Sequence, residues 1–297
     1  MEISTEFIDD KLVKTLLPNR PIYGHKGTFG RVLAMVGSLN YLGAAYLACG
    51  GAARSGAGLV TLAIAKTLQP LLAGSLIETT YLLLDDEEGE YTLRSVEDIL
   101  ESVSRSQVFL TGCGLQNNKA TINLLTHTIL SKRFPLIPIV MDAGALTAIS
   151  NVHQWFLRIG GDLVVTPHLG EMSILTGIAI EDIEKNKTSI AKDKAAEWNA
   201  IVVLKGAYTV IASPDGVVRH SPFANPGLAS AGTGDVLAGI ISGLIAQGLD
   251  VFDAAVCGVY LHGHTADDIT LHKGNAGILA NDILDCIPIS IKKIKES

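Results

Sequence analysis

The sequence predicts an α/β protein in which helices cover both faces of a mainly parallel central sheet, giving three layers. Short runs rich in Val, Ile and Leu alternate along the chain with longer segments of helical periodicity. Several of these runs are apolar almost throughout, as expected of strands that are covered on both faces. Because no low-complexity linker divides the chain, we expect residues 1–297 to form a single domain.

The individual elements follow from the same patterns. Strands are expected at residues 31–37, 59–64, 107–112, 138–143, 162–167 and 201–206. Helical patterns lie between them at residues 43–56, 95–105, 119–133 and 180–199, and two apolar helical segments follow Asp235 and Asp250. Strand-helix alternation implies right-handed crossovers and helices on both faces of the sheet. Residues 209–219 interrupt the alternation, because their Pro-Asp-Gly turn predicts a small hairpin.

Composition excludes several classes of protein. The 48% of hydrophobic residues can fill a large core, and the net charge of −7 argues against a broad nucleic-acid surface. The four cysteines are too widely spaced for a zinc knuckle or a disulfide framework. The acidic first ten residues do not resemble a signal peptide. The apolar stretch 236–249 is too short to span a membrane, so we predict a soluble, cytoplasmic protein.

Residues 225–235, Asn-Pro-Gly-Leu-Ala-Ser-Ala-Gly-Thr-Gly-Asp, form the most informative motif. A Gly-rich turn leads directly into an apolar helix, whose first N–H groups have no intrahelical partner and attract anions. Gly232 and Gly234 would let the backbone close around phosphate. Asp235 could take a proton from a substrate hydroxyl while these N–H groups stabilise a transferring phosphoryl group. The alternative is an ordinary turn in which Asp235 only favours the helix start.

Other polar residues follow strands and should lie at the same sheet edge, where open parallel sheets bind ligands. Glu171 and His168 are either site residues or a favourable first-turn carboxylate and a surface histidine. Lys205, which begins Lys-Gly-Ala-Tyr-Thr, either holds phosphate or lies at a hairpin corner. Asp142 either reaches Mg²⁺ through water or caps a helix.

Two further groups of residues are less informative. Residues 25–30, His-Lys-Gly-Thr-Phe-Gly, suit a flexible anion-contacting loop. His262, His264 and His272 lie in the last apolar helical region, and we interpret them as structural because the His-Gly-His spacing does not suit a metal pair on one helical face.

Seven motifs, taken in order, resemble the ADP/ATP-dependent NAD(P)H-hydrate dehydratases from about residue 10 to about residue 285. They are residues 25–30, 43–45, 54–58, 142–144, 166–171, 205–209 and 225–235. The resemblance implies a ribokinase-like three-layer αβα sandwich. It also implies a metabolite-repair lyase that dehydrates the S form of NADHX and NADPHX to NADH and NADPH while hydrolysing ADP or ATP.

The resemblance also implies a role for each matching residue. Asp235 would be the catalytic base, and Gly232, Thr233 and Gly234 would form the anion hole. Gly234 would also hold the nucleotide together with Lys205, Gly206, Ala207, Tyr208 and Thr209. Ala44, Gly114 and His168 would contact the hydrated dinucleotide along with Asp235, and Glu171 matches the superfamily's phosphate and Mg²⁺ glutamate.

The chain departs from the wider superfamily in three places. His168 stands where many ribokinase-like enzymes have asparagine, which argues against a sugar kinase. Ala229 and Ser230 replace an aspartate and a threonine, so Mg²⁺ handling is expected to differ from that of sugar kinases. The nearest alternative is a small-molecule hydroxyl kinase using the same Asp235 chemistry; a different class is a nucleotide-sensing binding protein without turnover, against which the intact Gly-Thr-Gly-Asp motif argues.

The resemblance further suggests a homo-oligomer whose substrates are small molecules, with no nucleic-acid or membrane partner. Family members are often fused to an N-terminal epimerase domain. The roughly 25 residues before the first motif cannot form one, so we expect a separate NAD(P)HX epimerase to act with this chain.

Overall fold

The computed structural model describes residues 6–297, so the first five residues of the acidic start lie outside it. A nine-stranded sheet forms the middle layer, in the order β11-β10-β9-β8-β7-β6-β1-β2-β3. Its strands are β1 Arg31–Met35, β2 Leu59–Ala65, β3 Thr80–Leu84, β6 Val108–Thr111, β7 Ile139–Met141, β8 Leu163–Val165, β9 Ile201–Leu204, β10 Val210–Ala212 and β11 Val218–His220; β4 Asp86–Glu87 and β5 Glu90–Tyr91 form a separate hairpin. All neighbours in the large sheet pair in parallel except β10, which is antiparallel to both β9 and β11.

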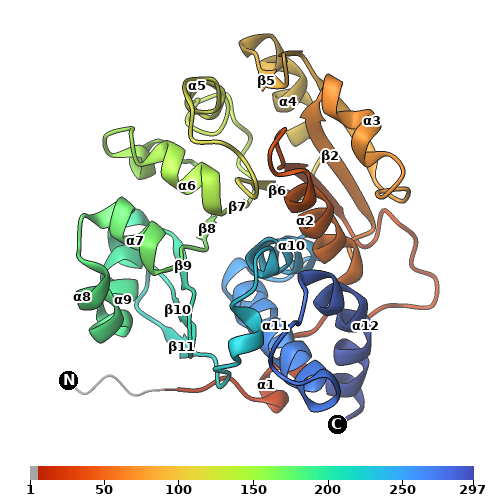
Figure 1. Cartoon of the computed structure of the whole chain (residues 1–297), viewed down its shortest axis with the longest axis vertical. Helices are drawn as coiled ribbons and strands as arrows, with labels where there is room; N and C mark the ends of the chain where they lie inside the picture. The colour runs from red at the N-terminus through yellow and green to blue at the C-terminus, as the bar shows by residue number, and fades with distance from the viewer. Residues whose placement is uncertain (1–5) are drawn as a thin grey trace.

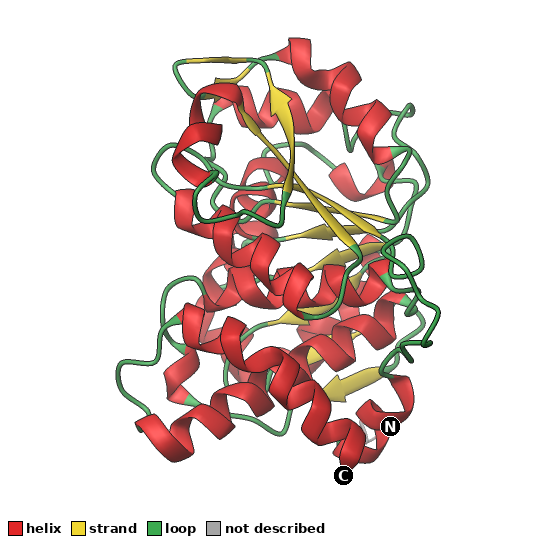
Figure 2. Ribbon diagram, turned by 90° about the vertical axis from the view of Figure 1, so that its right-hand side faces the viewer, coloured by secondary structure: helices red, strands yellow, loops and turns green. Residues whose placement is uncertain are grey.

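Helices cover both faces of this sheet, as Figures 1 and 2 show. They are α1 Asp10–Leu16, α2 Leu42–Arg54, α3 Gln69–Leu72, α4 Val96–Val103, α5 Lys119–His127, α6 Ala143–Ile149, α7 Leu169–Thr176, α8 Ile180–Lys185, α9 Lys187–Trp198, α10 Thr233–Ala246, α11 Val251–Lys273 and α12 Ala280–Glu296. On one face α2, α10 and α11 contact the central strands, with α12 and α1 packed outside them. On the other face α5 to α9 contact one another in succession and α9 packs on β9 and β10.

The order of the strands creates a switch point between β1 and β6. From β1 the chain proceeds outward to β2 and β3, then returns to β6 on the other side of β1 and continues to β9. Loops that follow neighbouring strands on either side of such a point diverge and leave a crevice for ligands. The loops after β1 and β6 are held together there, because the Gly37 amide donates to the Cys113 carbonyl at 2.7 Å and the Ser38 hydroxyl to the Gly114 carbonyl at 2.7 Å.

The fold prediction is confirmed, and the differences have local causes. All six predicted strands form, and so does the hairpin, whose turn is closed by the Gly216 amide bonding to the Ser213 carbonyl. The helix expected over 119–133 ends at His127, because Thr128 leaves helical geometry. The pattern at 180–199 forms two helices that meet at Asn186. The prediction missed β3, an edge strand with a mixed burial pattern that gives no clear periodic signal.

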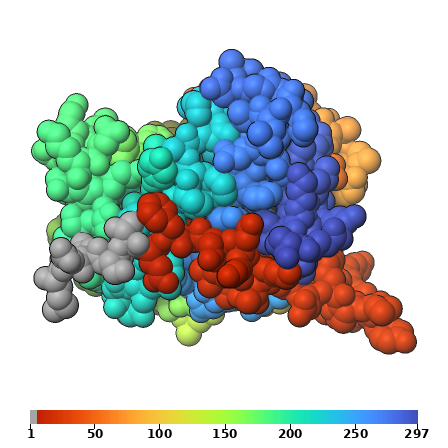
Figure 3. Space-filling view, turned by 90° about the horizontal axis from the view of Figure 1, so that it is seen from below, coloured from red at the N-terminus to blue at the C-terminus, as the bar shows by residue number. Residues whose placement is uncertain are grey.

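The N-terminal segment closes the face formed by α11 and α12. Phe7 bridges to His220 of β11, and the Tyr260 hydroxyl of α11 donates to Asp10 at 2.7 Å. In Figure 3 this segment (red) crosses the molecule between the cyan and blue regions. Within residues 6–297, no helix has both the length and the apolarity required to cross a membrane.

Candidate active site

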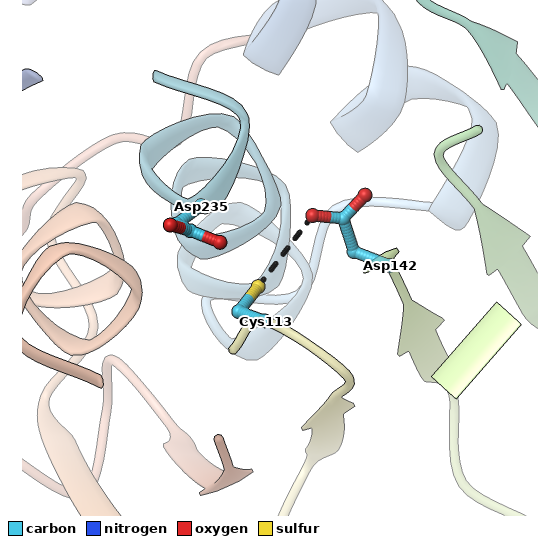
Figure 4. Close-up of side chains that lie close together, drawn as sticks. All are labelled: Cys113, Asp142 and Asp235. Carbon is cyan, nitrogen blue, oxygen red and sulfur yellow. Dashed lines mark hydrogen bonds between the residues drawn. The ribbon is translucent and has the colours of Figure 1, made fainter. Parts of the chain in front are cut away.

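Three side chains from different elements meet at the carboxyl edge of the sheet. Cys113 follows β6, Asp142 follows β7, and Asp235 lies in the first turn of α10; Figure 4 shows them turned toward one another. One potential ligand atom from each lies within 4.8 Å of the other two. The Cys113 thiol donates to Asp142 Oδ2 at 3.6 Å. The loop motifs that the sequence placed at one edge therefore do come together around Asp235.

Asp142 is fixed by neighbours on both sides. Its Oδ1 accepts hydrogen bonds from Lys205 Nζ at 2.6 Å and from Thr166 Oγ1 at 2.7 Å, and only 1% of the residue is exposed. Burial by itself lowers the pKa of Lys205, but the charges of Asp142 and Glu171 outweigh it, and the pKa of the ammonium is raised. Lys205 is therefore a permanent cation facing Asp142.

The start of α10 offers free backbone donors. Gly232 is its N-cap, with a left-handed φ of 89°, and the Val236 amide closes the first turn on the Gly232 carbonyl at 3.2 Å. In the part of the chain that the structure describes, the amides of Gly234 and Asp235 have no acceptor. A Cβ on Gly234 would lie 3.2 Å from Lys205 Nζ, so glycine leaves room for the ammonium beside the helix start. Free amides, the helix dipole and a cation together favour an anion.

The carboxyl group of Asp235 has an unusual environment for an aspartate. Burial raises its pKa to about 6, and the negative charge of Asp142 adds to this shift, while Lys205 and the Cys113 thiol oppose it. Burial also raises the pKa of Cys113 well above its usual range, so the thiol stays neutral and acts as a donor. A carboxylate that titrates close to neutral pH is suited to take up and release a proton.

His168 and Glu171 form a reciprocal cap at the start of α7. His168 Nδ1 accepts from the amides of Gly170 and Glu171 at 3.0 and 3.2 Å, while Glu171 Oε2 accepts from the His168 amide at 2.8 Å. His168 Nε2 lies 3.3 Å from Glu171 Oε1, and Lys205 Nζ lies 3.9 Å from Glu171 Oε2. Burial raises the pKa of Glu171. Both residues thus cap the helix, and Glu171 also lies beside Lys205.

Gly114 directly follows Cys113 in the chain, and Ala44 lies against it. Gly114 has a φ of 66°, and a Cβ there would be 2.6 Å from the Ala44 Cβ, so the two residues are in close contact. Ala44 lies in the first turn of α2, which packs along α10; Leu47 of α2 lies against Gly232. These two predicted substrate residues are therefore adjacent to each other and to the start of α10.

A cavity of about 740 Å³ opens on the opposite side, between the strand ends and helices α10 and α11. Lys205, Gly206, Ala207 and Thr209 line it, as do His168, Thr233 and Gly234. Tyr208 does not: its residue is 52% exposed and its backbone takes a left-handed φ of 51°, with its amide bonded to the Phe223 carbonyl. The structure thus gathers the predicted nucleotide segment around one cavity, with the Tyr208 side chain directed elsewhere.

The structure adds to two of the sequence interpretations. His262, which we interpreted as structural, is part of the cavity wall, because α11 packs across the sheet and brings one of its faces to the site. Residues 25–30 lie at the opposite edge, since they precede β1; a Cβ on Gly30 would strike the carbonyl of Ala246, the last residue of α10. Within this chain they are remote from Asp235.

The donor set suits a hard divalent cation. Asp142, Glu171 and Asp235 face one ammonium, that of Lys205, so their ionised carboxylates outnumber the nearby cation. Carboxylate oxygens and a bound phosphate are the ligands that Mg²⁺ prefers in proteins. The Cys113 thiol is a poor ligand for this ion, so the carboxylates are the candidates.

Comparison with known proteins shows the family of the chain. Residues 32–289 match the family model described as NAD(P)H-hydrate dehydratase. The bifunctional NAD(P)H-hydrate repair enzyme Nnr of Moorella thermoacetica is 40% identical over 284 residues, which make up 95% of this chain and 53% of that protein. The chain therefore spans about half the length of this bifunctional relative.

Two solved structures resemble the whole chain. The ADP/ATP-dependent NAD(P)H-hydrate dehydratase from Bacillus subtilis, co-crystallised with ATP and Mg²⁺, has a TM-score of 0.82 at 31% identity, covering 98% of this chain and 99% of that one. A ribokinase-like superfamily protein from Enterococcus faecalis has a TM-score of 0.85 at 24% identity, covering 100% and 99%. The predicted ribokinase-like fold is thereby confirmed.

Proposed function

The chain belongs to the NAD(P)H-hydrate dehydratase family, and we propose from this premise that it is a nucleotide-dependent lyase. Its substrates would be the S forms of NADHX and NADPHX, which it would dehydrate to NADH and NADPH at the expense of ADP or ATP. The observation that carries the proposal is the arrangement at Asp235. A carboxyl group whose pKa is raised to about 6 lies at a helix start with free amides, next to the ammonium of Lys205.

This arrangement fits a dehydration that passes through a phosphate ester. Hydroxide is a poor leaving group, whereas phosphate is a good one. The C6 hydroxyl oxygen attacks the terminal phosphorus of the nucleotide while Asp235 takes the proton of this hydroxyl. AMP leaves when the donor is ADP, and ADP leaves when the donor is ATP. Loss of a proton from C5 and of phosphate from C6 then restores the double bond between these carbons. The segment Gly232, Thr233 and Gly234 forms the anion hole, in which the free amide of Gly234 stabilises the charge on the transferring phosphoryl group.

The remaining residues position the two substrates. Lys205 and the backbone of residues 206–209, with Gly234, hold the nucleotide in the cavity, which these residues line apart from Tyr208. Ala44 and Gly114 contact the hydrated ring beside Asp235, and His168 contacts the dinucleotide from the start of α7.

We further propose that Mg²⁺ is bound with the nucleotide. Glu171 would hold the ion, and through it the phosphate, and Asp142 would act through water, since Lys205 and Thr166 already occupy its Oδ1. When bound, Mg²⁺ supplies positive charge that offsets the charge of the transferring phosphate.

Absorbance at 340 nm tests the function directly. Purified protein is mixed with (S)-NADHX, Mg²⁺ and either ADP or ATP, and phosphate release is followed in parallel. Recovery of absorbance that requires a nucleotide, with one phosphate released per NADH formed, supports the proposal and identifies the donor. A stable phosphorylated product in the ³¹P NMR spectrum, with no recovery at 340 nm, would instead indicate a small-molecule hydroxyl kinase.

A further inference from the structure

One buried histidine at the cavity has no part in the chemistry described above. His262 lies on α11 and is 7% exposed, and it lines the cavity together with Val259 and Gly263 of the same helix. Its Nε2 makes no hydrogen bond to any residue in the described range 6–297. Buried polar atoms in native proteins are nearly always paired, so an unpaired one beside a ligand cavity points to a partner supplied by the ligand.

The ring of His262 is electrically neutral at neutral pH. Burial lowers its pKa to about 4, and the charge of Lys205 acts in the same direction, while the Thr233 backbone opposes them. A neutral imidazole has one donor nitrogen and one acceptor nitrogen. The unpaired Nε2 can therefore act as an acceptor when Nδ1 carries the proton.

The residues around His262 indicate which part of a nucleotide it contacts. Phosphate is already provided for by Lys205 and by the free amides at the start of α10. The walls near His262 are apolar, with Leu237 one helical turn beyond Thr233, and Val259 one turn before His262 on α11. Phe223 completes them; its ring would lie only 2.3 Å from a Cβ on Gly263, so it packs directly on the α11 backbone. Apolar walls that carry a few neutral polar groups, His262 among them, suit a flat, uncharged nucleobase.

We propose that His262 recognises the purine base, its free nitrogen accepting a hydrogen bond from the 6-amino group of adenine. The inference rests on the proposed function only in taking the cavity as the nucleotide site. That nitrogen is buried in the structure, so the imidazole has to turn about its Cβ–Cγ bond to present it to the base. His262 is thereby a specificity determinant, and the protein distinguishes adenine from hypoxanthine, which carries an oxygen in place of the amino group.

Calorimetric titration tests this assignment without requiring turnover. The ligands are ADP, inosine diphosphate, which lacks the amino group, and 2′-deoxy-ADP, which lacks a ribose hydroxyl. The proteins are the wild type, His262→Leu, which has no acceptor, and His262→Gln, whose amide oxygen can accept. His272→Gln is the matched control, because His272 lies on the same helix, is exposed and is remote from the cavity lining. Thermal melts establish that each variant is folded.

The wild type and His272→Gln should bind ADP about tenfold more tightly than inosine diphosphate, the discrimination expected for one buried hydrogen bond. His262→Leu should bind the two nearly equally, and His262→Gln should retain part of the preference. If His262→Leu does not fold, the wild type and His262→Gln still provide the test.

Three results would overturn the assignment. The wild type could bind ADP and inosine diphosphate equally well, or the His262 variants could bind all three nucleotides more weakly by the same factor. The variants could also lose the preference for ADP over 2′-deoxy-ADP while keeping the preference for adenine. If adenine selectivity depends on His262 but the protein does not dehydrate NADHX, the proposed function is contradicted and the assignment of His262 still holds.

Discussion

Replacing Asp235 with asparagine should remove activity and at the same time stabilise the folded protein. In the folded state burial raises the pKa of this carboxyl group from 3.8 to about 6, so ionising it in place is unfavourable. At about 1.36 kcal/mol for each unit of pKa shift, ionisation of this group lowers the free energy of unfolding by on the order of 3 kcal/mol at pH 7.5. Asparagine has nearly the same shape and carries no charge, so the folded variant does not have this loss of stability.

The sign of the effect can be checked by changing the pH. The folded carboxyl group binds its proton more tightly than the unfolded one, so the wild type gains stability as the pH falls through 6 toward 3.8. The advantage of Asp235→Asn should therefore shrink by about 1.4 kcal/mol between pH 7.5 and pH 5. Urea unfolding of both proteins at the two pH values measures it, and other carboxyl groups cancel in the difference.

Asp282 provides a control of opposite sign. Hydrogen bonds from Lys273 and the Leu279 amide lower the pKa of Asp282, so its contribution to stability is present at neutral pH and is lost as the pH falls through its folded pKa. Asp282→Asn should destabilise the protein at pH 7.5, and less so in acid. An Asp235→Asn protein that is less stable than the wild type at pH 7.5, or whose advantage does not change with pH, would refute the reasoning about this site.

Three further predictions concern the same region. Lys205→Met leaves Asp142 without the ammonium that faces it at 2.6 Å, and urea unfolding should show a loss of about 3–5 kcal/mol; a loss below about 1 kcal/mol would mean that the buried pair is not needed. The rate constant kcat/KM of the wild type should fall about tenfold for each pH unit below pH 6, where the base is protonated, and a profile that stays level down to pH 5 would contradict this. Gly114→Ala should destabilise the protein by about 1–3 kcal/mol more than Gly177→Ala, because both glycines have a positive φ but only the first would bring a Cβ against α2; equal losses in thermal melts would count against a steric role.

The sequence predicted the part of the site that comes from strand ends. Cys113, Asp142 and Lys205 each follow a buried strand, and in a parallel sheet such residues must meet at one edge. Asp235 reaches the same edge because α10 starts there. Cys113 could have been recognised as a contact of Asp235 by this rule, since it is the second residue after β6.

His262 could not be found in that way. It lies in the middle of a long helix, and only the packing of α11 against the sheet and α10 determines which of its faces meets the cavity. Its apolar neighbours in the sequence indicate burial, but a buried histidine in a core and one in a cavity wall have the same periodicity. The composition of residues 25–30 likewise says nothing about which edge of the sheet they occupy.

Turnover of NADHX by the Asp235→Asn protein tests the central claim most directly. With (S)-NADHX, Mg²⁺ and the nucleotide that supports the wild type, the recovery of absorbance at 340 nm should be slower by at least about 100-fold, while calorimetry shows that the variant still binds nucleotide. Recovery at a rate close to that of the wild type would contradict the assignment of Asp235 as the base and, with it, the proposed mechanism.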